Sequence, residues 1–157
     1  MKRLLLLFPS LFCATLNAAD LPALWAERLK CVVAVEYFTE TETERRPNVA
    51  YGMVTDAEGT IILPAAAVDV RAAPTQLKDF KVYRPGDPVS TPAIYLGQDA
   101  LTGWHFVRVA EPLRSLLTPI ARFTAKGAGG DVALADPVWG IGLRNKDEDF
   151  TPYILQS

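Results

Sequence analysis

Few side chains of this sequence are suited to acid–base, nucleophilic or metal chemistry. It contains a single histidine, His105, and two cysteines, Cys13 and Cys31. Three carboxylates stand together near the C-terminal end, at residues 147–149. A zinc site usually takes three or four cysteine, histidine or carboxylate ligands, and the chain has no C-x-x-C or H-x-x-x-H pair. We therefore expect neither a metal site nor a cofactor.

Two of these groups also have a purely structural explanation. As a displaced general base, His105 would need a nucleophile within hydrogen-bond reach. The period of two in a strand places it opposite Trp104 and Phe106, which predicts a histidine packed on a strand face. The run at residues 147–149 could bind a cation. No glycine-spaced EF-hand pattern surrounds it, so we expect a solvated acidic turn.

Tryptophan and cysteine offer two further candidates. Trp25, Trp104 and Trp139 could form an aromatic binding surface, but their spacing on strand-like segments favours contacts in a core or with a second barrel. Cys31 could be reactive or could pair between chains. It opens an apolar segment, which favours a buried, small hydrophobic residue.

Composition limits the class of protein. The chain has 157 residues, of which 50% are hydrophobic and 22% charged, as in an ordinary globular domain. This composition excludes a disordered or coiled-coil chain, and the length predicts one domain. Lys and Arg number 16 against 18 Asp and Glu, so no basic excess indicates nucleic acid as a partner.

The first nineteen residues have the pattern of a secretory signal peptide. Lys2 and Arg3 precede an uncharged apolar run at residues 4–16, and small or polar residues follow up to Ala19. The run is shorter than the about 20 residues of a transmembrane helix, so we expect no transmembrane segment in the mature chain. A buried N-terminal helix or a short anchor is the alternative. The pattern predicts a secreted or periplasmic protein.

The remaining sequence indicates a short helix followed by strands. We expect the helix at residues 20–30, because Asp20 can cap it and four apolar residues then share one face. The segments rich in β-branched and aromatic residues are 31–39, 49–56, 60–64, 77–83, 93–96, 104–109, 132–134 and 138–143. Residues 40–48 are predicted to be a charged loop, residues 65–68 one helical turn, and residues 126–130 a flexible loop. Short strands separated by Gly/Pro turns favour a barrel or a sandwich.

Three segments resemble, in order, the trypsin-like serine proteases of the HtrA group. Residues 49–68 resemble the first-barrel hairpin, residues 97–109 a later strand and its preceding turn, and residues 131–143 the entry to the second barrel. The matched positions in the first segment are Gly52, Met53, Val54, Asp56, Ala57, Glu58, Gly59, Ile61, Ile62 and Val68. The resemblance implies an all-β fold, a trypsin-like antiparallel β-barrel at residues 31–157 with an incomplete second barrel.

The same resemblance leaves the catalytic positions without catalytic groups. A trypsin-like site needs a serine nucleophile, a histidine base and an aspartate that orients the histidine. The alignment places Ala66 at the histidine position and Gly103 at the aspartate position. No Gly-x-Ser-Gly-Gly motif follows, and the glycine-rich stretch at residues 127–131 has no serine. The sequence therefore predicts no catalytic residues.

These observations favour an exported trypsin-like domain without a triad. Such a domain binds a protein or peptide partner, or it is a degraded relative with little function of its own. One alternative is a serine endopeptidase, if the chain belongs to a longer protein or the alignment is misplaced. The other is an unrelated β-sandwich that binds a ligand at the cell envelope. Residues 131–157 supply too few strands to close a second barrel. We expect this tail to pack back onto the first barrel, or to self-associate with another chain through an open sheet edge.

Overall fold

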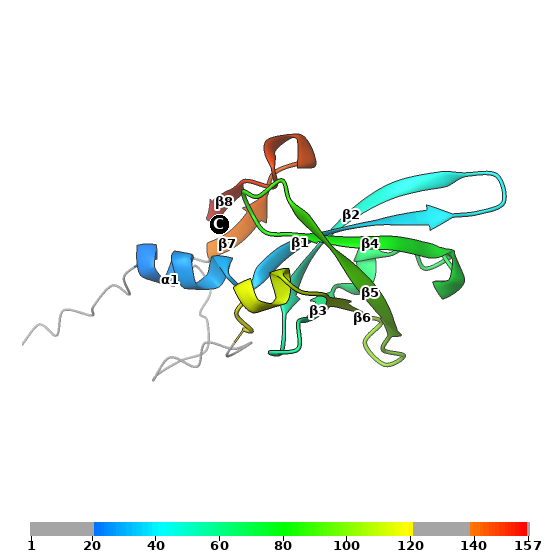
Figure 1. Ribbon diagram of the computed structural model, residues 1–157, viewed down its shortest axis with the longest axis horizontal. Helices are drawn as coiled ribbons and strands as arrows, with labels where there is room; N and C mark the ends of the chain where they lie inside the picture. The colour runs from blue at the N-terminus through cyan, green and yellow to red at the C-terminus, as the bar shows by residue number, and fades with distance from the viewer. Residues whose placement is uncertain (1–20, 121–138, 157) are drawn as a thin grey trace, which may run out of the picture.

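The structure is a computed structural model that describes residues 21–120 and 139–156. Six antiparallel strands close into a barrel in the order β1-β2-β3-β6-β5-β4 (Figure 1). Their bounds are β1 Val32–Glu40, β2 Arg45–Val54, β3 Thr60–Leu63, β4 Leu77–Tyr83, β5 Ser90–Gln98 and β6 His105–Val109. The predicted all-β barrel is thereby confirmed, and these strands do not form the two face-packed sheets of a sandwich.

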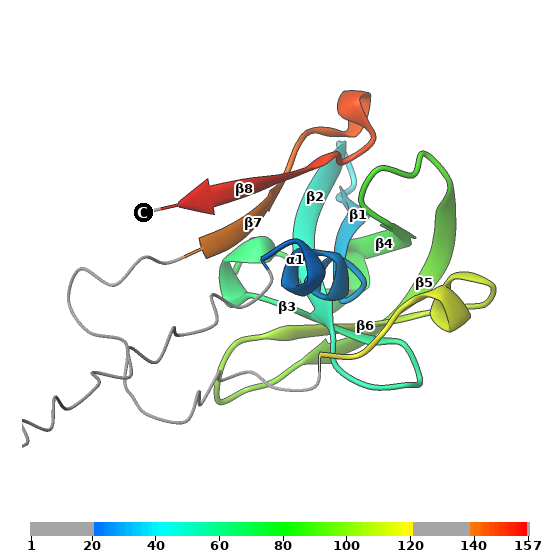
Figure 2. The same cartoon turned by 90° about the vertical axis from the view of Figure 1, so that its left-hand side faces the viewer.

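The remaining elements lie around the barrel. Helix α1 (Leu21–Leu29) precedes it, and β7 (Trp139–Leu143) and β8 (Pro152–Gln156) form a separate two-stranded sheet. Short 3-10 turns occur at η1 (Ala65–Ala67), η2 (Pro74–Gln76), η3 (Leu113–Leu116) and η4 (Lys146–Glu148). Figure 2 shows α1 and the β7–β8 hairpin on the same side of the barrel. Within the described residues, no helix is long and apolar enough to cross a membrane.

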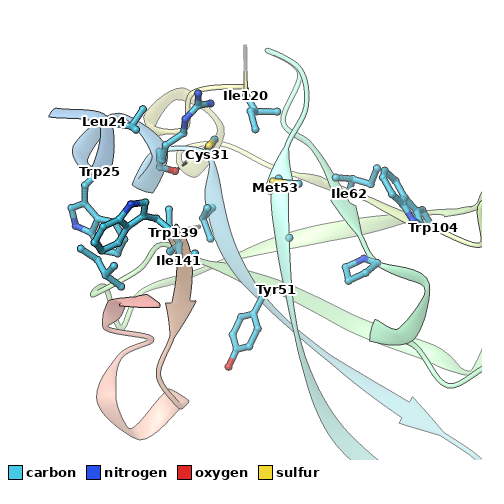
Figure 3. Close-up of a pocket in the computed structure, with 16 residues that line it drawn as sticks. Leu24, Trp25, Cys31, Tyr51, Met53, Ile62, Trp104, Ile120, Trp139 and Ile141 are labelled. Carbon is cyan, nitrogen blue, oxygen red and sulfur yellow. Dashed lines mark hydrogen bonds between the residues drawn. The ribbon is translucent and has the colours of Figure 1, made fainter. Parts of the chain in front are cut away.

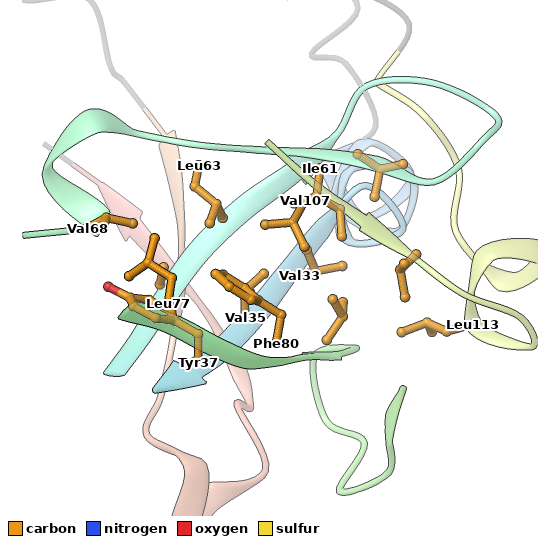
Figure 4. Close-up of a cluster of buried hydrophobic side chains, with 14 residues drawn as sticks. Val33, Val35, Tyr37, Ile61, Leu63, Val68, Leu77, Phe80, Val107 and Leu113 are labelled. Atoms are coloured by element: carbon orange, nitrogen blue, oxygen red, sulfur yellow. The ribbon is translucent and has the colours of Figure 1, made fainter. Parts of the chain in front are cut away.

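Alternation along the strands fills the barrel with apolar side chains. On β1, Val33, Val35 and Tyr37 belong to the interior cluster (Figure 4). The intervening Ala34 and Glu36 are also buried, because the β7–β8 hairpin covers the outer face of β1. The other interior residues are Ala50, Val54, Ile61, Leu63, Val68, Leu77, Phe80, Val82, Val107, Val109 and Leu113. Burial on both faces explains why β1 reads as an almost unbroken apolar run.

A glycine allows β2 and β3 to approach closely. A Cβ atom added at Gly52 would lie 2.7 Å from the carbonyl oxygen of Ile62 and 2.6 Å from a methyl group of Leu63. Any side chain at this position would displace the backbone of β3 or the interior packing. Gly52 is thus a packing requirement of the barrel.

The tail packs back onto the barrel, as one branch of the sequence prediction expected. Leu143 and Phe150 form a second apolar cluster with Ala34 and Tyr83 of the barrel. The rings of Tyr83 and Phe150 lie 5.1 Å apart. The backbone amide of Gly86 donates a hydrogen bond of 2.9 Å to the carbonyl of Asp149. The hairpin is therefore joined to the barrel by both apolar and polar contacts.

Several predicted boundaries hold, whereas others are corrected. The helix, the strand at residues 77–83 and the turn at residues 65–68 are confirmed within one or two residues. The charged segment predicted at residues 40–48 is an exposed hairpin tip, as expected, but the loop is limited to residues 41–44. The predicted length is wrong, because β2 already begins at Arg45 and pairs it with Glu40. The β1–β2 hairpin extends beyond the barrel (Figure 1), where polar residues can continue a strand without a core to face.

Two further strands differ from the prediction, and some predicted features cannot be compared. β5 is longer than residues 93–96, because its pairing with β6 continues past an irregularity between Tyr95 and Gly97. β8 was not predicted. The signal peptide at residues 1–19, the loop at 126–130 and the strand at 132–134 lie outside the described residues, as does most of the segment that resembles a second-barrel entry.

Candidate functional site

The two positions at which the family resemblance expects catalytic groups lie on neighbouring segments. Ala66 is exposed in η1, directly after β3. Gly103 lies in the turn between β5 and β6. A Cβ atom added at Gly103 would lie only 3.2 Å from the Cβ of Ala65. The fold therefore brings the two segments together, although neither Ala66 nor Gly103 has an ionisable side chain.

Hydrogen bonds from the barrel hold both segments in place. The Tyr37 hydroxyl donates to the carbonyl of Ala67 at 2.7 Å, which fixes the end of η1. The Gln98 side-chain amide donates to the carbonyl of Gly103 at 2.9 Å. Gly103 has a φ of +73°, a backbone conformation that favours glycine. These contacts fix the backbone of both segments relative to the barrel.

The carboxylate of this turn is engaged in local structure. Asp99 accepts hydrogen bonds from the backbone amide of Thr102 at 2.8 Å and from its hydroxyl group. These hydrogen bonds lower the pKa of Asp99 from its ordinary value. No histidine lies near enough to be oriented by it, since His105 points into the barrel. Asp99 therefore stabilises the turn between β5 and β6.

A cavity of about 630 Å³ borders these segments. Pro64, which precedes η1, and Trp104, which follows Gly103, both line it. Its floor is the outer face of β2 and β3, and its other walls come from α1, β7 and β8. Figure 3 shows Trp25 and Trp139 together at one end and Trp104 beyond Ile62 at the other. The cavity thus lies beside the segments of Ala66 and Gly103 and is also lined by elements from both ends of the described chain.

All three tryptophans of the sequence line this cavity. Trp104 is 40% exposed and Trp139 47% exposed, so neither is a core residue of the barrel. The other predicted possibility, contacts with a second barrel, stays a prediction. Trp104 precedes the inward-facing His105, and alternation therefore turns it outward. Trp139 is on β7, whose one partner among the described strands is β8. The alternative considered from the sequence, an aromatic surface, agrees better with these positions.

The sequence analysis missed other walls of the cavity. Tyr51 and Met53 point outward from β2, whereas their neighbours Ala50 and Val54 point into the barrel. Large apolar side chains at outward positions of a half-exposed strand indicate a covered or binding face. β2 has apolar residues on both faces, so only the topology shows that Tyr51 and Met53 face outward. Ile154 of β8 was missed because its strand was missed.

Among the described residues that line the cavity, Arg28 alone is charged. It lies in the last turn of α1, and its carbonyl accepts a hydrogen bond of 3.0 Å from the Cys31 thiol. Cys31 is buried, and this burial raises the pKa of its thiol. A protonated, buried thiol is a poor nucleophile. The prediction that Cys31 acts as a small hydrophobic residue is therefore confirmed.

The remaining sequence candidates lie away from the cavity. His105 is 5% exposed, and its Nδ1 lies 2.9 Å from the Tyr95 hydroxyl. Burial lowers the pKa of His105, and the predicted position on a strand face is confirmed. The acidic residues 147–149 are exposed in and after η4, and Glu148 pairs with Arg144. In the described part of the chain, no three potential ligands are grouped as a metal site.

Sequence comparisons do not identify a family. No protein-family model matches the chain, and no curated protein matches it. What the protein does is therefore inferred from the barrel, from the residues at the positions named by the sequence resemblance and from the cavity beside them.

Proposed function

We propose that the protein is an exported, trypsin-like domain of the HtrA type that binds a protein or peptide partner without cleaving it. The ordered resemblance of three sequence segments and the closed six-stranded barrel support the trypsin-like assignment. The signal-peptide pattern at residues 1–19 supports export.

One observation carries the non-catalytic part of the proposal. The segments of Ala66 and Gly103 meet, as the base and its orienting carboxylate must do in a triad. Neither residue can accept a proton. The serines within the described residues are Ser90 and Ser115, and neither lines the cavity. A triad that lacks every member loses the several orders of magnitude in rate that the triad supplies.

The cavity supports a binding role. Its volume of about 630 Å³ falls in the range of about 300–1,000 Å³ that is typical of ligand sites. Tryptophan and tyrosine are the side chains most enriched at the energetic centres of protein interfaces, and here they surround a concave, half-exposed surface.

Two assays on the purified mature protein test this function. We expect no cleavage of unfolded casein and no labelling by a serine-directed phosphonate probe. Fluorescein-labelled casein should nevertheless bind saturably, with no change in its mass. Turnover together with labelling of one serine, both abolished when that serine is changed to alanine, would establish an endopeptidase instead.

A gain-of-function variant provides a stricter test. The double variant Ala66→His and Gly103→Asp introduces a histidine and an aspartate at the positions where the resemblance places the base and its orienting carboxylate. We still expect no turnover, because no nucleophile is available for them to activate. Far-UV circular dichroism should accompany the assay, since Gly103 has a positive φ. N-terminal sequencing of the exported protein tests the signal peptide, and a mature chain that begins at Met1 would contradict it.

A further inference from the structure

We propose that the tryptophan-lined cavity binds an apolar peptide segment that carries an acidic residue, and that Arg28 recognises the acidic group. This inference rests on the proposed peptide-binding function. It adds the location of the site, the chemistry of the segment and the residue that selects it.

The apolar part of the segment follows from the walls of the cavity. Tyr51, Trp104, Trp139 and Ile154 are each 40% or more exposed and gather on this one concave surface. Each of these side chains leaves apolar surface exposed to water. Burial of that surface by an apolar ligand contributes about 25 cal/mol per Å² to the free energy of binding. The volume of about 630 Å³ is sufficient for a few apolar side chains. A short apolar sequence is therefore the complementary ligand.

The acidic part follows from the charge of Arg28. It is the single charged residue that residues 21–120 and 139–156 contribute to the lining. Of the arginines that the structure describes, six form ion pairs with described carboxylates, and Arg28 and Arg71 do not. Arg71 does not line the cavity. A guanidinium at the border of an apolar cavity attracts a carboxylate more strongly than one in bulk water, and it can bind both carboxylate oxygens.

The adjoining strand favours a peptide over a small amphipathic molecule. β7 contributes Trp139, Gly140 and Ile141 to the cavity. In the described chain β7 pairs with β8 alone, so one edge of β7 retains backbone donors and acceptors without a strand partner. An extended peptide can pair with such an edge while its alternate side chains enter neighbouring pockets.

Arg28 also has a structural role in α1, and the experiment must distinguish this role from ligand recognition. A cation in the last turn of a helix also complements the helix dipole. Lysine preserves this charge but lacks the planar fork that binds a carboxylate at two points. Arg28→Lys therefore retains the dipole interaction and should lose part of the recognition.

Intrinsic fluorescence gives a direct readout, because every tryptophan of the chain lies at the cavity. The probes are three blocked peptides without tryptophan, each with a Leu-Phe-Leu core followed by glutamate, glutamine or lysine. We expect a saturable shift in emission, with affinity in the order glutamate, glutamine, lysine. Arg28→Gln should weaken binding of the glutamate peptide about tenfold, which corresponds to about 1.4 kcal/mol. Arg28→Glu should invert the order, and the control Arg71→Gln should leave it unchanged.

The outcomes separate the inference from the proposed function. Equal affinity for the three peptides, or an order that Arg28→Glu does not alter, would overturn the role of Arg28 while peptide binding stands. Saturable binding of casein without any response to the peptides would place the partner elsewhere and overturn the cavity as the site. Absence of binding to both casein and peptides would overturn the proposed function as well. Circular dichroism of each variant verifies that it is folded.

Discussion

Replacing Lys146 with methionine should loosen the β7–β8 hairpin from the barrel. Glu36, on β1, is only 6% exposed and is the sole carboxylate buried among the described residues. One of its oxygens accepts a hydrogen bond of 2.6 Å from the Lys146 ammonium, and the other accepts one of 2.9 Å from the Tyr83 hydroxyl. Lys146 belongs to η4, between the two strands of the hairpin. The substitution therefore leaves a buried charge without its cation.

The expected loss of stability follows from the distance between the charges of Glu36 and Lys146 and from the solvent exposure of Lys146. At 2.6 Å, Coulomb's law gives about 1.6 kcal/mol in water and about 6 kcal/mol at an effective dielectric constant of 20. The Lys146 side chain is 51% exposed, so solvent screening and side-chain ordering remove much of the larger value. We expect Lys146→Met to lower the free energy of unfolding by about 1–3 kcal/mol, because the Glu36 charge is left uncompensated.

A double-mutant cycle with Glu36→Gln isolates this pair. Urea denaturation should be followed both by tryptophan emission, which reports Trp139 on the hairpin, and by far-UV circular dichroism. We expect a coupling energy of about 1–2 kcal/mol between the two substitutions. Arg144→Met, which removes the exposed pair with Glu148, is the matched control and should cost less than about 0.5 kcal/mol. Additive effects of Lys146→Met and Glu36→Gln would refute the reasoning.

The coupling should also depend on pH. Burial raises the pKa of Glu36, but the hydrogen bonds from Lys146 and Tyr83 outweigh it and hold the pKa below the ordinary value of 4.5. A carboxyl group with a lowered pKa in the folded state stabilises the fold above its unfolded pKa and loses this contribution as the pH falls through its folded pKa. The coupling energy should therefore be complete at neutral pH and should vanish in strong acid. A coupling that persists unchanged in acid would contradict the ionic character of the pair.

Three further predictions concern the barrel. Gly52→Ala should lower the free energy of unfolding by about 1–3 kcal/mol, because the new methyl group meets the backbone of β3; an unchanged urea midpoint would contradict the close approach. Tyr37→Phe should cost about 1 kcal/mol through loss of the hydrogen bond to Ala67, and hydrogen exchange should quicken in η1 specifically. The pKa of His105 lies below 6.5 in the folded state because of burial, so stability should decline as the pH falls below 6.5, where the unfolded chain binds a proton first. His105→Gln should remove that decline, which a series of urea midpoints between pH 7 and pH 5 can measure.

The strands of the barrel were predictable where a local pattern decides them. Residues 77–83 match β4 fully, because apolar residues recur there and a Pro/Gly turn follows, although the alternation is interrupted at Asp79, which has a φ of +52°. The beginning of β2 at Arg45 was not predictable from hydrophobicity, since this part of the hairpin lies outside the barrel. Its pairing depends on a turn in which the amide of Thr41 donates to the carbonyl of Glu44 at 2.8 Å.

The candidate site was predictable only in part. The sequence indicated that Ala66 and Gly103 lack catalytic groups, but their proximity is a property of the closed barrel. The cavity has no local sequence signature, because its walls combine a helix before the barrel, the outer face of β2 and β3, and a hairpin after it. Apolar residues such as Tyr51 and Trp139 are indistinguishable in sequence from core residues until the topology determines which face they occupy.

The ion pair between Glu36 and Lys146 joins residues 110 positions apart. The hairpin that carries Lys146 can therefore dock only after the strands of the barrel have been synthesised. All strands of the barrel are present once residue 109 has emerged during synthesis, whereas the wall formed by β7 and β8 requires residues up to 156. Chains fold from the N-terminal end as they emerge, so the barrel can close before its cavity exists. A nascent or proteolytically shortened chain that ends before Trp139 would retain the strands of the barrel without the β7 and β8 walls of the cavity. The proposed peptide binding therefore requires a chain that extends through β8.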